Sequence, residues 1–193
     1  MLPSLCINLS KDEQFSLLDI ARRSISHGLE SGRALSIDVA QLSKNLQVDS
    51  AVFTTLMRSG ELRGCIGSLQ AVDPLAQAVA NSAFNAAFRD RRFGKVDPTE
   101  LDELRVEISV LSALDLIKVD SRQALLDALK PGEDGLLMED RGYRSTFLPK
   151  VWEKIPLPNQ FLEELMQKAG LPAGHWSDTI RFYRYHTLSF AEN

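Results

Sequence analysis

The sequence predicts an α+β fold with a mainly antiparallel sheet and flanking helices. Three observations carry this prediction. Strand patterns follow one another across short turns, as in hairpins. Further strand patterns are separated along the chain. Segments with helix-capping signals lie between them, without the strict strand–helix alternation of a parallel sheet.

The first element is a helix that begins after Ser10. Ser10 and Glu13 have the spacing of a capping box, in which each side chain accepts a hydrogen bond from the other residue's backbone. The stretch FSLLDIARRSISHGL then repeats apolar residues at helical spacing. Gly28 is the predicted end of this helix, since glycine favours helix C-termini.

A β-hairpin follows the first helix. The run AVFTTLM is rich in β-branched and aromatic residues, RSGE reads as a turn, and LRGCIGSL reads as the returning strand. The hairpin places an arginine, two glycines and a cysteine in five consecutive positions, 63–67.

The clearest helix signal starts at Asp73, a good N-cap, with Pro74 as the first helical residue and Gly94 as the terminator. One face of this alanine-rich helix consists of Leu75, Val79, Ala83 and Ala87. Small side chains on that face allow a sheet or a helix to approach closely.

The remaining elements alternate between short helices and strands. Asp97 and Pro98 open a helical turn before the strand RVEISVL, and Ser121 caps a helix through ALLDALK. GLLMEDRGYRSTFLP predicts two strands. Asn159 caps a helix that ends at Gly170, and TIRFYRYHTLSF predicts one final strand.

Composition limits the class of protein. The chain has 193 residues, 44% of them hydrophobic and 25% charged, which suits one domain over residues 1–193 with one substantial core. The net charge of −4 disfavours nonspecific binding to nucleic acid or anionic membranes. The N-terminal stretch lacks a secretory pattern, and no apolar run is long enough for a bilayer, which favours a cytoplasmic protein.

The chain has two cysteines, Cys6 and Cys65, and no CxxC motif. This count argues against a disulfide framework or an iron–sulfur cluster. Two cysteines and three scattered histidines form no recognisable zinc site, so we predict no metal and no cofactor.

Alternation along the strand LRGCIGSL places Arg63, Cys65 and Gly67 on one face. A cation near a thiol stabilises the thiolate, one requirement for a nucleophile. We therefore predict that this face borders a cleft, with Gly67 keeping it open and Gly64 admitting another backbone from behind. The alternative is that Cys65 is a small buried filler, the more frequent role of free cysteine.

A second polar run, Arg89 to Lys95, ends the alanine-rich helix. Its cations offset the helix dipole, whereas the anion Asp90 requires a partner there. We predict that this partner is Arg92 or the backbone of the same loop. Binding of phosphate or nucleic acid by the run is a weaker alternative.

Three further residues are candidates for the same site. Glu107 and Ser109 lie on the polar face of RVEISVL, and a Glu107–Arg63 ion pair would leave Cys65 less cationic. His175, in the loop LPAGHWSD, is a weak candidate for a general base. The sequence contains no HExxH, Walker A, dinucleotide-binding or GxSxG pattern.

These residues resemble the AMMECR domain family, whose signature hexapeptide is LRGCIG. Further blocks match in order: VFTTL, PLAQAVANSAFNAAFRDRRF, ELDELRVEISVLS, FLPKV and FLEELMQKAGLP. The resemblance covers most of the chain. It carries over Arg63, Gly64, Cys65 and Gly67 from the hexapeptide, Asp90, Arg92 and Phe93 from a D.RF block, Glu107 and Ser109 from the strand block, and Lys168 and Gly170 from KAG.

The resemblance implies a compact α+β domain with a larger and a smaller lobe and a cleft edged by the hexapeptide. It also implies partners, a Memo-type protein and a radical S-adenosylmethionine protein, but no settled activity. Met166 stands where the family often has cysteine, which argues against a dithiol or metal role shared with Cys65. Ala71-Val72 replaces acidic or aromatic residues at the predicted cleft mouth.

The sequence leaves three candidate functions. Cys65, activated by Arg63 and by a base such as His175, would act as a thiol-dependent enzyme on a small substrate. Alternatively, the domain binds a protein or peptide at the cleft without catalysis. Nucleic-acid binding through Arg89–Lys95 is the weakest reading. The oligomeric state stays open.

Overall fold

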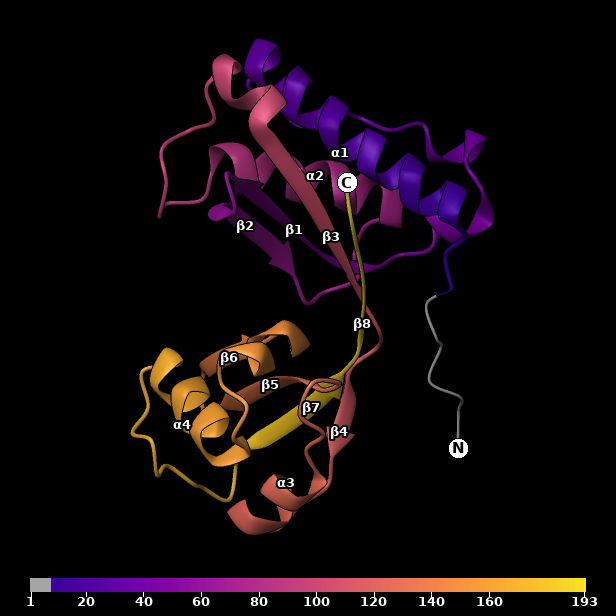
Figure 1. The fold of residues 1–193 in the computed structure, drawn as a ribbon. Coiled ribbons are helices and arrows are strands. Elements are labelled where there is room, and N and C mark those ends of the chain that lie inside the picture. The colour runs from indigo at the N-terminus through magenta and orange to yellow at the C-terminus, as the bar shows by residue number, and fades with distance from the viewer. Residues whose placement is uncertain (1–7) are drawn as a thin grey trace. The chain divides into compact units, whose positions relative to one another are not determined.

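The computed structural model describes residues 8–193, which form two compact units (Figure 1). The larger unit comprises residues 8–111 and Leu188–Asn193, and the smaller comprises Ser112–Thr187. The α+β class with antiparallel pairing is confirmed, although the strands form two sheets instead of one. Cys6 lies outside the described residues.

The larger unit contains a four-stranded sheet in the order β2-β1-β3-β8, with β1 antiparallel to both β2 and β3. Its strands are β1 (Ala51–Arg58), β2 (Glu61–Ser68), β3 (Leu104–Leu111) and β8 (Thr187–Ala191), and its helices are α1 (Lys11–Ser31) and α2 (Leu75–Phe88). Three 3₁₀ turns, η1 (Val39–Gln41), η2 (Lys44–Gln47) and η3 (Pro98–Glu103), join them.

The smaller unit contains a second antiparallel sheet, ordered β4-β7-β5-β6. Its strands are β4 (Asp115–Ile117), β5 (Gly135–Asp140), β6 (Tyr143–Phe147) and β7 (Arg181–Tyr185), with α3 (Arg122–Ala128), α4 (Pro158–Lys168) and the 3₁₀ turn η4 (Pro149–Glu153). It has its own core, in which Trp152 stacks on the buried ring of Phe161 with ring centroids 3.7 Å apart.

The predicted capping box starts α1, and both of its hydrogen bonds are present. The predicted stop at Gly28 is wrong. Gly28 is buried inside the helix, and a Cβ there would meet the Phe88 ring at 2.5 Å. The helix ends at Gly32, whose φ of 69° is the left-handed conformation that glycine favours. Glycine therefore serves close packing at the first position and termination at the second.

Helix α2 packs against one face of the sheet, as Figure 1 shows. The predicted apolar face of α2 is confirmed, because Leu75, Val79, Ala83 and Ala87 are all buried. Within this layer the hydroxyls of Thr54 and Ser82 lie 2.6 Å apart, so the polar groups satisfy each other. A Cβ on Gly64 would come within 2.2 Å of the carbonyl oxygen of Ala86, so glycine permits this close contact.

Helix ends account for the other differences. Pro74 is the N-cap of α2, while the Asp73 carboxylate accepts a hydrogen bond from Asn81. The helix stops at Phe88, well before Gly94. In α4 the N-cap is Leu157, and Asn159 lies inside the first turn. The predicted N-caps Asp73 and Asn159 therefore miss the observed ones by one residue in α2 and by two residues in α4.

The predicted final strand is divided in two. His186 separates β7 of the smaller unit's sheet from β8 of the larger unit's sheet. The alternating pattern of TIRFYRYHTLSF holds on both sides of this break, so periodicity alone did not reveal it. Within residues 8–193 no helix has the length and apolar character needed to cross a membrane.

The contact at Gly64 leads to a stability prediction. Gly64→Ala places a methyl group against the Ala86 carbonyl and should lower the free energy of unfolding by about 1–3 kcal/mol, the usual cost of overpacking. Urea unfolding measures the change. Gly94→Ala is the matched control, because a Cβ there meets nothing within 4 Å. Equal stability of the two variants would contradict the predicted packing role.

Candidate functional site

The hexapeptide lies on β2, an edge strand of the larger unit's sheet. Its pairing with β1 contains a β-bulge, since Leu56 pairs with Gly64 while the next residue, Met57, pairs with Leu62. Arg63 is therefore an extra residue in β2. A bulge re-aims the side chain that it carries, and strict alternation does not predict where Arg63 points.

The Arg63 guanidinium binds Glu100, whereas the partner considered from the sequence was Glu107. Its Nε and Nη2 atoms donate to the two carboxylate oxygens of Glu100 at 2.8 Å each, and Nη1 donates to the Gly94 carbonyl at 2.9 Å. This hydrogen bonding lowers the pKa of Glu100 to about 2. The charge of Arg63 is thus paired within the 94–100 loop.

The backbone of Cys65 is held by Asp90 and Arg92. The Cys65 N–H donates to Asp90 Oδ2 at 2.9 Å, and Arg92 Nη2 donates to the Cys65 carbonyl at 3.2 Å. Arg92 Nη2 also donates to Asp90 Oδ2 at 2.7 Å. The predicted partners of Asp90, Arg92 and its own loop, are both confirmed, because the Arg92 N–H donates to Asp90 Oδ1 at 3.1 Å. We call this set of contacts the Asp90 clamp.

The Cys65 thiol is partly buried and has a hydroxyl donor beside it. Thr55, the register partner of Cys65 on β1, donates its Oγ1 hydrogen to Cys65 Sγ at 3.3 Å. Glu107 is the register partner of Thr55 on β3, so these three residues form one row across the sheet. The group that donates to the sulfur is thus a neutral hydroxyl.

Gly67 is paired with Phe53, and its side-chain position is occupied by that residue. A Cβ on Gly67 would lie 2.4 Å from the Phe53 ring and 2.2 Å from the Val52 carbonyl. Gly67 therefore accommodates an aromatic ring on this face, where the sequence predicted open space.

The other residues carried over from the resemblance occupy defined places. The Arg92 guanidinium lies 5.4 Å from the Phe93 ring centroid, within cation–π range. Ser109 is buried, and its hydroxyl is 2.8 Å from that of Ser189 on β8. The first contact lies within the 89–95 loop, and the second joins β3 to β8.

His175 belongs to the smaller unit, where its ring binds Asp140. Its Nε2 lies 2.6 Å from Asp140 Oδ2, and the buried carboxylate also accepts hydrogen bonds from Thr179 and Ser177. The hydroxyl of Thr179, followed by His175, lowers the pKa of Asp140 to about 2. His175 is thus held by a carboxylate of its own unit.

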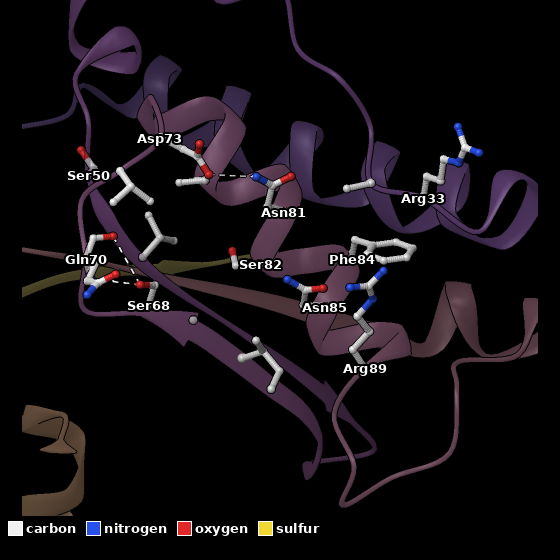
Figure 2. Close-up of a pocket in the computed structure, with 16 residues that line it drawn as sticks. Arg33, Ser50, Ser68, Gln70, Asp73, Asn81, Ser82, Phe84, Asn85 and Arg89 are labelled. Atoms are coloured by element: carbon white, nitrogen blue, oxygen red, sulfur yellow. Dashed lines mark hydrogen bonds between the residues drawn. The ribbon is translucent and has the colours of Figure 1, made fainter. Parts of the chain in front are cut away.

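A pocket of about 430 Å³ lies in the larger unit between β2 and α2 (Figure 2). Ile66, Gly67 and Ser68 line it, but Arg63 and Cys65 do not. Ile66 alternates with Cys65 along β2, so the pocket and the thiol lie on opposite faces of the strand. Within residues 8–193 no group of three or more His, Cys, Asp or Glu side chains is arranged to hold a metal ion.

Sequence reasoning missed Thr55 and Glu100. Thr55 was part of a recognised strand, but its partner across the hairpin depends on register. Glu100 forms a capping box with Asp97, a local signal that the sequence carries. Glu100 lies 37 positions after Arg63, and the two residues meet because the loop that follows α2 folds back to β2. A polar stripe on α2, Asn81, Asn85 and Arg89, was visible at helical spacing and points to the pocket.

The chain folds into two α+β units, and the LRGCIG hexapeptide lies on the second strand of a β-hairpin, where the Asp90 clamp covers its outer edge. These features define the class of protein. The model of the AMMECR1 family matches residues 18–190, and the chain belongs to that family.

Several known proteins are similar in sequence to this chain along nearly its whole length. A protein of Methanothermobacter thermautotrophicus is 36% identical over 191 residues, covering 96% of this chain and 97% of that protein. Protein MK0488 of Methanopyrus kandleri is 34% identical over 95% of this chain and 90% of its own length. The crystal structure of the uncharacterized protein PH0010 from Pyrococcus horikoshii is 33% identical, with a TM-score of 0.85 over 92% of this chain and 90% of that one.

The Asp90 clamp predicts a pH-dependent stability. Hydrogen bonds from Arg92 hold the pKa of Asp90 well below its usual value of 3.8, so the carboxylate is stabilised in the folded state. Asp90→Asn should lower the free energy of unfolding by about 1–3 kcal/mol at pH 7. The difference from the wild type should persist above the unfolded pKa and shrink as the pH falls below it.

Denaturant unfolding between pH 2 and pH 7 measures this profile. Asp19→Asn is the control, because Asp19 forms an exposed pair with Arg23 on α1 that should contribute under about 0.5 kcal/mol. A pH-independent difference for Asp90→Asn would contradict the charged clamp.

Proposed function

We propose that the residues around Cys65 form a thiol-dependent site that acts on a small substrate. One observation carries the proposal, the hydrogen bond from Thr55 Oγ1 to Cys65 Sγ at 3.3 Å. This hydrogen bond holds the sulfur in a fixed place on β2, and cysteine is a nucleophile in its thiolate form. The thiol is also partly exposed, as a reacting group must be.

The backbone contacts of Cys65 support the same proposal. Asp90 and Arg92 engage both its N–H and its carbonyl, which restricts movement of the sulfur relative to β1. Fixed placement of a nucleophile reduces the entropy that a reaction must lose on reaching the transition state. In this account the Cys65 S–H bond breaks and an S–C bond forms to a carbonyl carbon, while the carbonyl π bond opens and its oxygen takes up the proton. Thr55 holds the sulfur in place, and Asp90 and Arg92 position the strand. Arg63 contributes through Glu100 to the loop and not to the thiol.

Partner proteins form the finer part of the proposal. From the family resemblance we propose a Memo-type protein and a radical S-adenosylmethionine protein as partners. A domain that binds these partners without catalysis is the rival account. Cys65→Ser separates the two, because it should abolish substrate conversion while a purely binding domain would work unchanged.

The thiol's reactivity gives a direct prediction. In a Cys6→Ser background, native Cys65 should react with iodoacetamide near neutral pH without denaturant. Thr55→Val should slow this alkylation by about two- to tenfold, because the variant loses a hydrogen bond to sulfur. Mass spectrometry of the alkylated protein measures the rate.

Thr54→Val is the matched control. Thr54 neighbours Thr55 on the same strand, but its hydroxyl bonds Ser82 on the opposite face. Its removal should leave the alkylation rate unchanged. Reaction of Cys65 only after denaturant is added would overturn the proposal and leave the cysteine as a packing residue.

A further inference from the structure

One wall of the pocket between β2 and α2 includes the backbone of β2. In the antiparallel pairing of β1 with β2, residue pairs alternate between those that exchange hydrogen bonds and those that do not. The N–H and carbonyl of Cys65 turn away from β1 to Asp90 and Arg92, so Cys65 belongs to a non-bonded pair. Gly67, two residues on, belongs to the next such pair and directs its N–H and carbonyl to the same outer edge.

Gly67 contributes backbone atoms to the pocket, because glycine has no side chain and it lines the cavity. No described residue caps its edge groups in the way that the Asp90 clamp caps those of Cys65. An edge strand with such groups is a template for another extended chain. The open edge begins where the clamp ends.

The opposite wall of the pocket is a polar stripe along α2. Asn81, Asn85 and Arg89 are spaced at four-residue intervals and share one face of the helix. Figure 2 shows Asn85 and Arg89 side by side at one end of the pocket, with Asp73 and Asn81 toward the other. The pocket therefore has a cationic end and an acidic end.

Arg89 has no carboxylate partner among residues 8–193, unlike Arg58, Arg63 and Arg92. Its guanidinium lies 5.4 Å from the Phe84 ring centroid, a stacking that orients the group while leaving its N–H donors available. A guanidinium with an amide beside it suits a carboxylate, which accepts two parallel hydrogen bonds.

The direction of a bound chain follows from the packing of α2. The close contact of Gly64 with Ala86 places the C-terminal turn of α2 over the first half of β2, and the Thr54–Ser82 bond places an earlier turn opposite Ile66. Helix α2 therefore runs antiparallel to β2, and Arg89 lies toward the clamped end. A chain added antiparallel to β2 would end at Arg89, where the clamp closes the edge.

We propose that this groove binds the free carboxyl terminus of an extended peptide. The peptide pairs with the backbone of Gly67 and places its terminal carboxylate on Arg89 and Asn85. The Asp73 carboxylate, held by Asn81 at 3.0 Å, disfavours an anion at the opposite end and so fixes the orientation. The pocket's volume of about 430 Å³ suits a short peptide end. This binding is independent of the thiol on the other face.

The test uses the full chain and two synthetic libraries of random hexapeptides, one with free C-terminal carboxylates and one with C-terminal amides. The immobilised protein should retain free-acid peptides and not their amides. Arg89→Ala should weaken the binding of a retained peptide by about tenfold or more, as expected for loss of a charge-assisted hydrogen bond. Hydrogen exchange of the Gly67 amide should slow when the peptide binds.

Two variants separate binding from helix stability. Arg91→Ala removes an exposed arginine that does not line the pocket and should bind as the wild type does. Arg89→Lys keeps a cation at the end of α2 but loses the guanidinium fork, and should bind more weakly at unchanged thermal stability. The proposal is overturned if neither library is retained, if amides bind equally, if Arg89→Lys binds fully, or if Gly67 exchange does not change.

Discussion

The carboxylate of Asp90 is the constraint on which the hexapeptide region depends. It is buried and accepts hydrogen bonds from the Cys65 N–H and from the backbone and guanidinium of Arg92, which in turn donates to the Cys65 carbonyl. One ionised side chain therefore replaces the neighbouring strand that Cys65 lacks and anchors the loop that follows α2. Edge strands need such covering to avoid unwanted pairing. Because the covering stops at Cys65, the next outward residue, Gly67, keeps an open edge.

The charges around the thiol follow from a second constraint, the bulge in β2. The bulge inserts Arg63 as an extra residue, and its guanidinium binds both carboxylate oxygens of Glu100. The charge of Arg63, two residues before Cys65, is thus paired with Glu100. The group that donates a hydrogen bond to the sulfur is the hydroxyl of Thr55 on the paired strand. The two faces of β2 consequently differ in chemistry. One presents a thiol with a neutral donor, and the other borders a pocket with a cationic end.

Much of the fold was predictable from local patterns, because caps, turns and apolar periodicity are short-range effects. The capping box at Ser10, the hairpin, the apolar face of α2 and the cap at Ser121 all appear as predicted. Two features were not, since they depend on contacts distant in sequence. Gly28 looked like a stop because its packing against Phe88 is tertiary. The strand broken at His186 kept one alternating pattern through two different sheets. In the site, the sequence predicted that Asp90 has a partner, because an anion at a helix C-terminus is unfavourable without one. The pairing of Glu100 with Arg63 was not predictable, because it depends on the bulge in β2.

The outer edge of β2 is closed at Cys65 by the Asp90 clamp and open at Gly67. Residue-resolved amide hydrogen exchange of the free native protein tests it, since both amides point to the same outer edge and differ in their partners. We expect the Cys65 amide, bonded to Asp90 at 2.9 Å, to exchange far more slowly than the Gly67 amide. We also expect Asp90→Asn to reduce the protection at Cys65 and leave that at Gly67 unchanged. Equal protection of the two amides in the wild type would contradict the claim.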